Sequence, residues 1–245
     1  IGRSSIGKNH TVLEIGPGRG IITKELVRAA KKVIAVERDQ KLYSSLRQTL
    51  GLVGNLELHL GDFLSFTFPK QPYKVFANIP FIITADVIRK LISDDIFREA
   101  YLVVQKEAAQ KFIGKPFDRK NQMASVLLKP WFEISVFWEF ARGDFIPRPN
   151  IDVVMIKIKR REEPLIPIGQ KETFSGFVLY TYNRSKVAKL EFSQILGLFN
   201  DFLAKTDARK KARVSQEAQM ILKSEKNLQK IYRTRKDKSW RRFKS

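Results

Sequence analysis

The chain has 245 residues, 43% of them hydrophobic, which suffices for one large α/β domain with a smaller appendage. Its 46 lysines and arginines exceed its 25 acidic residues, and the resulting net charge of +21 favours a polyanionic partner, since no apolar run approaches the roughly 18 residues that cross a membrane. The absence of cysteine excludes disulfides, thiolate zinc sites and cysteine nucleophiles, and only His10 and His59 remain, so we expect no metal site.

The first predicted strand, residues 11–15, is apolar and β-rich and ends in the loop Gly16-Pro17-Gly18-Arg19-Gly20. Apolar residues at helical spacing follow the loop. A dinucleotide-binding loop would place its third glycine at Ile21, so the sequence argues against a nicotinamide cofactor. The spacing Glu14-x-Gly16-x-Gly18-x-Gly20 resembles instead the first motif of S-adenosylmethionine-dependent methyltransferases, in which the acid can meet the charged methionine end of the cofactor.

Acidic residues also follow the next two predicted strands. Residues 33–36 end on Glu37, where doubly wound sheets place an acceptor for ribose hydroxyls, and residues 55–60 lead into Gly61-Asp62-Phe63. Asp62 could bond the adenine amine of a cofactor. Each acid alone is also compatible with a solvated position at a strand end, but their order along the chain favours ligands.

The fourth predicted strand, residues 74–77, leads into Asn78-Ile79-Pro80-Phe81 at the edge where α/β sheets bind ligands. An exocyclic adenine amine is a poor nucleophile because its lone pair is delocalised into the ring. The Asn78 side-chain oxygen and the carbonyl beside Pro80 can accept hydrogen bonds from that amine and favour a pyramidal nitrogen, while Phe81 can stack on the ring. Four residues alone would favour an ordinary strand-to-helix loop.

The remaining predicted elements of the sheet region are a helix over 83–92, a strand over 101–104, a helix to about Ile113, and an antiparallel pair over 133–140 and 153–159. Arg89 and Lys90 lie on the first helix. The polar segment 114–122 carries Lys115, Arg119 and Lys120 in reach of a phosphate backbone, although such loops are more often simply solvated. Within Phe145-Ile146-Pro147-Arg148-Pro149, the prolines would present Phe145 rigidly near the site.

Prolines at 164 and 167, with Gly169, indicate a boundary, beyond which we expect short helices over 174–182, 192–203 and 215–232. Residues 204–245 contain 15 basic and 4 acidic residues, a net charge of +11. This basic region is a candidate for RNA binding, and a disordered tail is the alternative for its last dozen residues.

Taken in order, these motifs resemble the ribosomal RNA adenine N6-methyltransferases over about residues 12–165. Asn-Ile-Pro-Phe, Gln105-Lys106-Glu107-Ala108-Ala109 and Lys129-Pro130-Trp131-Phe132 are closer to the Erm type, which acts on large-subunit ribosomal RNA and confers resistance to macrolides, lincosamides and streptogramin B. Small-subunit enzymes of the KsgA type more often carry Asn-Leu-Pro-Tyr. The family also has a Gln-Asn-Phe-like segment before the first strand, which this sequence does not contain.

The resemblance implies a Rossmann-like, seven-stranded S-adenosylmethionine-dependent methyltransferase domain over residues 1–163 and a small, basic helical RNA-binding region and tail over 164–245. It implies three sets of site residues: for the cofactor Glu14, Gly16, Gly18, Glu37, Arg38, Asp62, Phe63 and Asn78; for catalysis Asn78, Ile79, Pro80, Phe81 and Phe145; and for RNA Arg89, Lys90, Lys115, Arg119 and Lys120.

We therefore expect a cytoplasmic, monomeric enzyme whose partner is ribosomal RNA and which needs neither a membrane nor a metal. The target adenine must leave its stack, which favours a loop or junction in RNA. A small-subunit dimethyladenosine transferase is one alternative, and a noncatalytic nucleic-acid-binding protein on the same scaffold is another, although intact Glu14, Glu37, Asp62 and Asn78 argue against lost chemistry. A DNA or protein-glutamine methyltransferase is disfavoured, because those enzymes usually carry Asn/Asp-Pro-Pro-Tyr/Phe.

Overall fold

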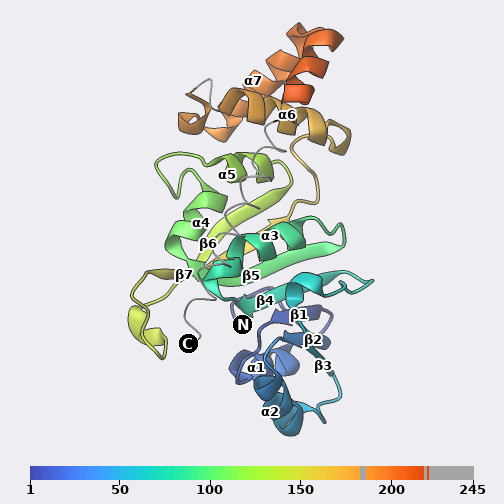
Figure 1. Cartoon of the computed structure of the whole chain (residues 1–245), viewed down its shortest axis with the longest axis vertical. Helices are drawn as coiled ribbons and strands as arrows, with labels where there is room; N and C mark the ends of the chain where they lie inside the picture. Colours follow the sequence, from blue (N-terminus) through green and yellow to red (C-terminus); the bar gives the residue numbers. More distant parts are fainter. Residues whose placement is uncertain (183–185, 218–219, 221–245) are drawn as a thin grey trace, which may run out of the picture. The chain divides into compact units, whose positions relative to one another are not determined.

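The computed structural model describes residues 1–182, 186–217 and 220 (Figure 1). The chain divides into two compact units, the first made of Ile1–Ile113 and Trp131–Glu163, the second of Gly114–Pro130 and Pro164–Ser245. The sequence predicted one boundary between residues 163 and 164, with residues 114–130 in the first region. That boundary between domains stays a prediction, because compactness alone does not show which parts fold independently.

The first unit is built on a single seven-stranded sheet in the order β3-β2-β1-β4-β5-β7-β6. The strands are β1 (Thr11–Ile15), β2 (Lys32–Glu37), β3 (Leu56–Leu60), β4 (Tyr73–Asn78), β5 (Phe97–Gln105), β6 (Phe132–Glu139) and β7 (Val153–Arg160). Neighbouring strands are parallel except at β7, which runs antiparallel to β5 and to β6. This sheet confirms the predicted α/β, Rossmann-like fold.

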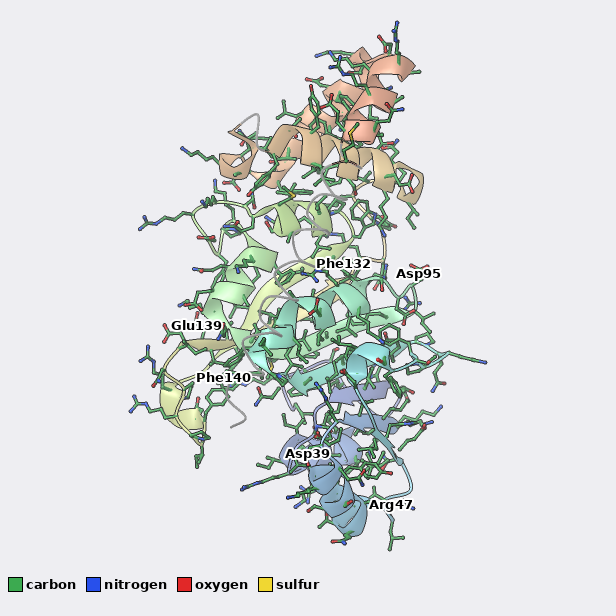
Figure 2. The ribbon with its side chains drawn as sticks, in the orientation of Figure 1. Asp39, Arg47, Asp95, Phe132, Glu139 and Phe140 are labelled. Atoms are coloured by element: carbon green, nitrogen blue, oxygen red, sulfur yellow. The ribbon has the colours of Figure 1, made fainter. Side chains whose placement is uncertain are left out.

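Helices α1 (Ile21–Ala29), α2 (Gln40–Leu50), α3 (Thr84–Ile92) and α4 (Lys106–Ile113) alternate with the strands. Successive crossovers run from β1 through β2 to β3 in one direction and from β4 to β5 in the other. Right-handed crossovers therefore place α1 and α2 on one face of the sheet and α3 on the opposite face. Figure 2 labels Asp39 and Arg47 near the two ends of α2, and the Asp39 carboxylate caps this helix by accepting the N–H groups of Lys41 and Leu42.

The core lies along the central strands, and all five residues of β1 are buried. Such continuous burial suits a parallel strand that is covered on both faces. The chain builds outward from β1 to β3 and then returns to place β4 on the other side of β1. At this reversal the carboxyl ends of β1 and β4 lie at the topological switch point, which is where sheets of this class bind ligands.

The second unit contains α5 (Met123–Leu128), α6 (Lys171–Tyr182) and α7 (Phe192–Lys205). Phe174 and Phe177 of α6 pack against Phe199 of α7, with ring centroids 5.1 and 5.5 Å apart. The predicted C-terminal helices are thus confirmed over α6 and α7, while the helix expected over residues 215–232 falls largely outside the described residues.

Two features of the fold differ from the sequence prediction. Strand β5 begins at Phe97 rather than Tyr101, because the charged Glu99, which interrupts the apolar run, is buried and ion-paired within the strand. Helix α5, only six residues long, was not predicted.

Among the described residues, no helix has both the length and the apolar character that crossing a membrane requires.

Candidate active site

The glycine loop after β1 adopts backbone angles that side chains rarely tolerate. Gly16, Gly18 and Gly20 have φ angles of 64°, 59° and 78°. A Cβ atom on Gly16 or Gly18 would meet no atom within 4 Å, so open space borders the backbone at both positions. At Gly20 a Cβ would lie 2.6 Å from the Leu46 Cδ2 atom, which ties this glycine to the packing of α2. Gly16 and Gly18 therefore leave room for a ligand, whereas the lack of a side chain at Gly20 allows α2 to pack closely against the loop.

Glu37 joins the end of β2 to the glycine loop. Its side chain is 6% exposed, and its two carboxylate oxygens accept the N–H groups of Gly18 at 3.0 Å and Asp39 at 2.9 Å. Each oxygen keeps a further lone pair, so Glu37 can still accept ribose hydroxyls. Arg38 is exposed, and its guanidinium lies 3.8 Å from the Asp62 carboxylate at the end of β3.

Glu14 is a buried acid at the carboxyl end of β1. It is 1% exposed, and its Oε2 atom has no hydrogen-bond partner among the described residues. Burial raises the pKa of the Glu14 carboxyl to about 7; the nearby Thr23 hydroxyl lowers it and the Glu37 carboxylate raises it further. A buried carboxyl with one oxygen left without a hydrogen bond, beside an open glycine loop, fits a ligand with a cationic group, as S-adenosylmethionine has. Thr23, whose buried hydroxyl acts on this carboxyl, had no signal in the sequence.

The segment after β3 is a short turn capped by Asp62. The Oδ1 atom of Asp62 accepts the Leu64 N–H at 2.9 Å, at the start of the 3₁₀ helix η1 (Phe63–Ser65). Phe63 is buried and packs edge-on against Phe68, with ring centroids 6.1 Å apart. The second carboxylate oxygen of Asp62 stays on the side of Arg38, at the same carboxyl edge as Glu37.

Asn78-Ile79-Pro80-Phe81 lies where the sequence placed it, at the carboxyl end of β4. Asn78 pairs in register with Val103 of β5 and is exposed, whereas Ile79 is 2% exposed, so the backbone of Ile79 rather than its side chain is available to a base. Pro80 is exposed with φ at −57°, and Phe81 opens the 3₁₀ helix η2 (Phe81–Ile83), which precedes α3. The loop therefore lies at the carboxyl end of β4, next to that of β1.

Two aromatic rings pack against one core cluster that includes Val12, Phe76 and Tyr101. Phe81 and Phe145 are both half-buried against this cluster. Phe145 also meets Phe140, labelled in Figure 2, with ring centroids 5.1 Å apart and planes inclined at 66°. The first unit thus contains every predicted cofactor and catalytic residue.

The predicted RNA contacts have different surroundings. Arg89 is exposed on α3 and forms an ion pair with Asp86 at 2.6 Å, whereas the neighbouring Lys90 bonds to backbone carbonyls within its own unit. In the second unit, Lys115 pairs with Glu191 at 2.5 Å, while Arg119 and Lys120 are exposed. Within the described part of the chain, no group of three histidine, aspartate or glutamate side chains gathers as a metal site.

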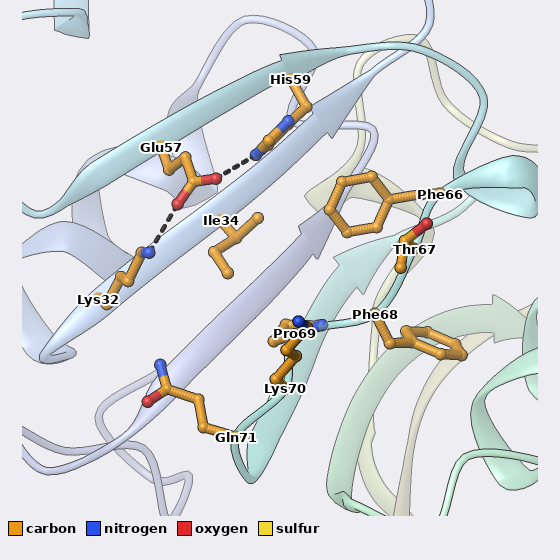
Figure 3. A pocket seen from close by; sticks show the side chains of 10 residues that line it. All are labelled: Lys32, Ile34, Glu57, His59, Phe66, Thr67, Phe68, Pro69, Lys70 and Gln71. Carbon is orange, nitrogen blue, oxygen red and sulfur yellow. Dashed lines mark hydrogen bonds and ion pairs between the residues drawn. The ribbon is translucent and has the colours of Figure 1, made fainter.

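A hollow of about 500 Å³ lies on β2 and β3, away from these residues (Figure 3). Ile34 forms part of its lining, whereas its neighbour Val33 packs with Leu26 of α1, so the hollow lies on the face opposite α1. Glu57 bonds to Lys32 at 2.6 Å and to His59 at 2.5 Å, as the dashed lines show. Residues 66–71 form the other wall, and none of the predicted site residues lines this hollow.

Comparisons with known proteins all point to one family. The model of the ribosomal RNA adenine dimethylase family matches residues 1–233. Ribosomal RNA small subunit methyltransferase A of Listeria monocytogenes serotype 4a is 32% identical over 182 residues, which cover 70% of this chain and 62% of the relative, so the chain spans less than two thirds of that relative's length. The enzyme of the same name from Mycoplasmopsis pulmonis is 32% identical over 201 residues, covering 76% of this chain and 79% of the relative.

Two solved structures extend the comparison. The 23S rRNA methyltransferase ErmE aligns with a TM-score of 0.75 and 26% identity, over 80% of this chain and 92% of that one. A dimethyladenosine transferase from Plasmodium falciparum aligns with a TM-score of 0.64 and 30% identity, over 73% of this chain and 65% of that one. These matches confirm the predicted KsgA/Erm superfamily and S-adenosylmethionine as the cofactor, while the individual site residues stay predictions.

Proposed function

Because the chain belongs to the ribosomal RNA adenine dimethylase family, we propose that it transfers methyl from S-adenosylmethionine to N6 of an adenine in large-subunit ribosomal RNA. The observation that carries this proposal is the exposed Asn78 at the carboxyl end of β4, the strand that pairs with β1 and so lies next to its glycine loop. A base amine held there would lie next to a cofactor held by Glu37 and the glycine loop.

In this proposal the chain promotes methyl transfer by orienting the adenine amine toward the methyl group. Bound S-adenosylmethionine supplies an electrophilic methyl group on a sulfonium sulfur. The Asn78 side-chain oxygen and the Ile79 carbonyl accept the N6 hydrogens, which draws the nitrogen lone pair out of the ring. Pro80 has no N–H and a fixed φ, so it stiffens the loop, and the rings of Phe81 and Phe145 provide stacking surfaces for the base.

The choice of the large subunit rests on two features. The alignment with ErmE covers 92% of that chain, and Asn-Ile-Pro-Phe is closer to the Erm type. An enzyme of this kind would confer resistance to macrolides, lincosamides and streptogramin B and would act on ribosomes in the cytoplasm. The second candidate is a small-subunit dimethyladenosine transferase, which is favoured by the 32% identity to relatives with that name.

Methyl transfer to separated ribosomal RNAs tests the proposal. The protein is incubated with cofactor labelled on its methyl group and with purified large-subunit or small-subunit RNA, and the labelled base is mapped. We expect label on an adenine N6 of large-subunit RNA. Label confined to small-subunit RNA would establish the second candidate, and binding of cofactor and RNA without any transfer would favour a noncatalytic role.

Resistance is tested separately in a macrolide-sensitive bacterial host. Expression of the chain should raise the inhibitory concentration of a macrolide, because N6 methylation would remove the drug's contact with the base. The Asn78→Ala variant at matched expression is the control and should leave the host sensitive. Equal protection by both variants would contradict a resistance mechanism based on methylation.

A further inference from the structure

Lys90, in the last turn of α3, is half-buried and contacts the segment that follows Asp62. Its Nζ atom donates hydrogen bonds to the carbonyl oxygens of Leu64 at 2.9 Å and Phe66 at 2.6 Å. The same ammonium group lies 5.3 Å from the centre of the Phe63 ring and 5.0 Å from that of Phe68. One lysine thus contacts two carbonyls and two rings of the same short segment, which is not a strand of the sheet.

The opposite side of this segment has little support from the sheet. Residues 66–71 border the hollow of about 500 Å³ on β2 and β3, and Figure 3 shows the Phe66 ring directed toward His59 while Phe68 points away from it. Phe68 instead stacks on Tyr73, with ring centroids 5.5 Å apart. Because the hollow replaces packing on one side, the segment depends on its contacts with α3 and with the start of β4.

We propose that Lys90 is a positioning residue for the cofactor site, which fixes the turn after β3 so that Asp62 meets the adenine amine of S-adenosylmethionine. This inference rests on the proposed cofactor role of Asp62. The turn begins at Asp62, whose carboxylate caps η1, so movement of the Leu64 and Phe66 carbonyls would displace the carboxylate as well. Burial lowers the pKa of the Lys90 ammonium, and the Asp62 charge opposes this lowering.

The position of Lys90 on α3 gives the contact a second consequence. Helix α3 follows Asn78-Ile79-Pro80-Phe81 and the turn η2, so the same helix starts at the proposed base-binding loop and ends at the segment that holds Asp62. Arg89 precedes Lys90 on this helix but is exposed and pairs only with Asp86 among the described residues. The two adjacent cations, both predicted to contact RNA, therefore have different roles.

Substitution of the two neighbours tests this assignment without any RNA. Lys90→Met keeps an apolar stem against the two rings but removes the ammonium, and Arg89→Met is the matched control. We expect the calorimetric Kd of S-adenosylmethionine to rise about tenfold in Lys90→Met, the size of one charged hydrogen bond, and to stay near the wild-type value in Arg89→Met. Lys90→Arg, which restores charge and donors, should recover most of the affinity.

Salt dependence of RNA binding and kinetics provide independent measurements. Lys90→Met should leave the slope of log affinity against log salt unchanged, whereas Arg89→Met should reduce the slope by about one if Arg89 contacts a phosphate. With a methylatable RNA, Lys90→Met should raise KM for the cofactor and leave kcat near wild type at saturating cofactor. Amide hydrogen exchange should increase around residues 62–68 and not across β1 and β4.

The inference would be overturned by wild-type cofactor affinity in Lys90→Met, by a salt slope that falls in that variant, or by faster exchange throughout the sheet, which would mean general destabilisation. A Lys90→Arg variant that folds normally but recovers no affinity would also contradict it. Failure of the proposed function looks different. In that case wild-type protein would not bind the cofactor, or would bind it without methylating either ribosomal RNA.

Discussion

At the scale of single residues, the buried carboxyl of Glu14 makes cofactor binding dependent on pH. Burial raises its pKa to about 7, so the folded, cofactor-free protein favours the protonated acid. The free energy of unfolding therefore decreases as the pH rises from 4.5, the ordinary pKa of the acid, through about 7. The cationic methionine end of the cofactor should favour the ionised form. We therefore expect cofactor affinity to increase between about pH 6 and about pH 8.

Calorimetric titration at these two pH values measures the effect. The Glu14→Gln side chain cannot ionise, so the cofactor affinity of this variant should change little between the two pH values. At the higher pH it should be weaker than the affinity of the wild-type protein. A wild-type affinity that is flat over this interval would mean that Glu14 does not face the charged end of the cofactor. The Glu37→Gln variant tests whether the pH dependence belongs to the neighbouring acid instead.

Asn78 should contribute to the rate of methyl transfer more than to binding. Its oxygen is proposed to hold the N6 hydrogens most strongly as the nitrogen becomes pyramidal, so Asn78→Ala should lower kcat by about 10²–10³. RNA affinity should hardly change, because phosphate contacts supply most of it. Single-turnover rates at saturating RNA and cofactor are the measurement. Phe81→Tyr keeps a stacking face and serves as the active control; a near wild-type rate in Asn78→Ala would leave the loop as scaffold.

At the scale of elements, Glu99 ties β5 to three other parts of the first unit. It is 4% exposed and pairs with Lys74 of β4 at 3.1 Å and Lys157 of β7 at 2.8 Å, and it accepts the Ser5 hydroxyl. Burial raises the pKa of its carboxyl, but hydrogen bonds from Lys157, Ser5 and Lys74 outweigh this effect and hold the pKa at about 2. Because its pKa is lowered in the folded protein, ionised Glu99 stabilises the fold at pH values above 4.5, the ordinary pKa of the acid.

This stabilisation should be lost as the pH falls from about 4.5 toward 2, and it corresponds to about 3 kcal/mol. Glu99→Gln should therefore lower the free energy of unfolding at neutral pH by a similar amount and flatten its dependence on pH in this interval. Chemical denaturation at a series of pH values measures both. Glu133→Gln, which removes an exposed ion pair with Arg161, is the control and should cost less than about 1 kcal/mol. Equal losses in the two variants would contradict a special role for Glu99.

The elements that the sequence predicted best are those whose patterns are local. The run of residues 11–15, the glycines after it and the order of acids at strand ends all lie where expected, because a buried parallel strand and its ligand-binding edge both leave signals in consecutive residues. The start of β5 was missed because a buried Glu99 looks like a strand boundary until its lysine partners, far away in sequence, are known.

Other features could not be predicted from consecutive residues. Helix α5 is too short to show a helical period, so Met123–Leu128 is equally compatible with a buried strand or turn. Lys90 and Arg89 are adjacent cations with the same local pattern, and only the tertiary contacts of Lys90 with Leu64 and Phe66 separate them. The position of the Thr23 hydroxyl beside Glu14 is likewise a property of packing.

At the scale of the whole molecule, charge is the property most directly linked to the proposed substrate. The net charge is +21, and residues 204–245 contribute +11 of it, mostly beyond the described residues. Each phosphate that these cations neutralise releases bound counterions from RNA, which gives binding its dependence on salt. The predicted role of this region as an RNA-binding tail can therefore be tested through salt rather than through affinity at one condition.

Truncation after Met220 removes 10 basic and 2 acidic residues and keeps the packed helices α6 and α7. If the tail binds RNA, the slope of log affinity against log salt should flatten by about 0.7–0.9 for each phosphate that the shortened protein no longer neutralises, and cofactor affinity should stay the same. Replacing the ten basic residues by glutamine in the untruncated chain is the control for chain length and should give the same slope as the truncation. An unchanged slope in both variants would assign RNA binding to residues 1–220, where the exposed cations Arg89, Arg119 and Lys120 are the next to substitute.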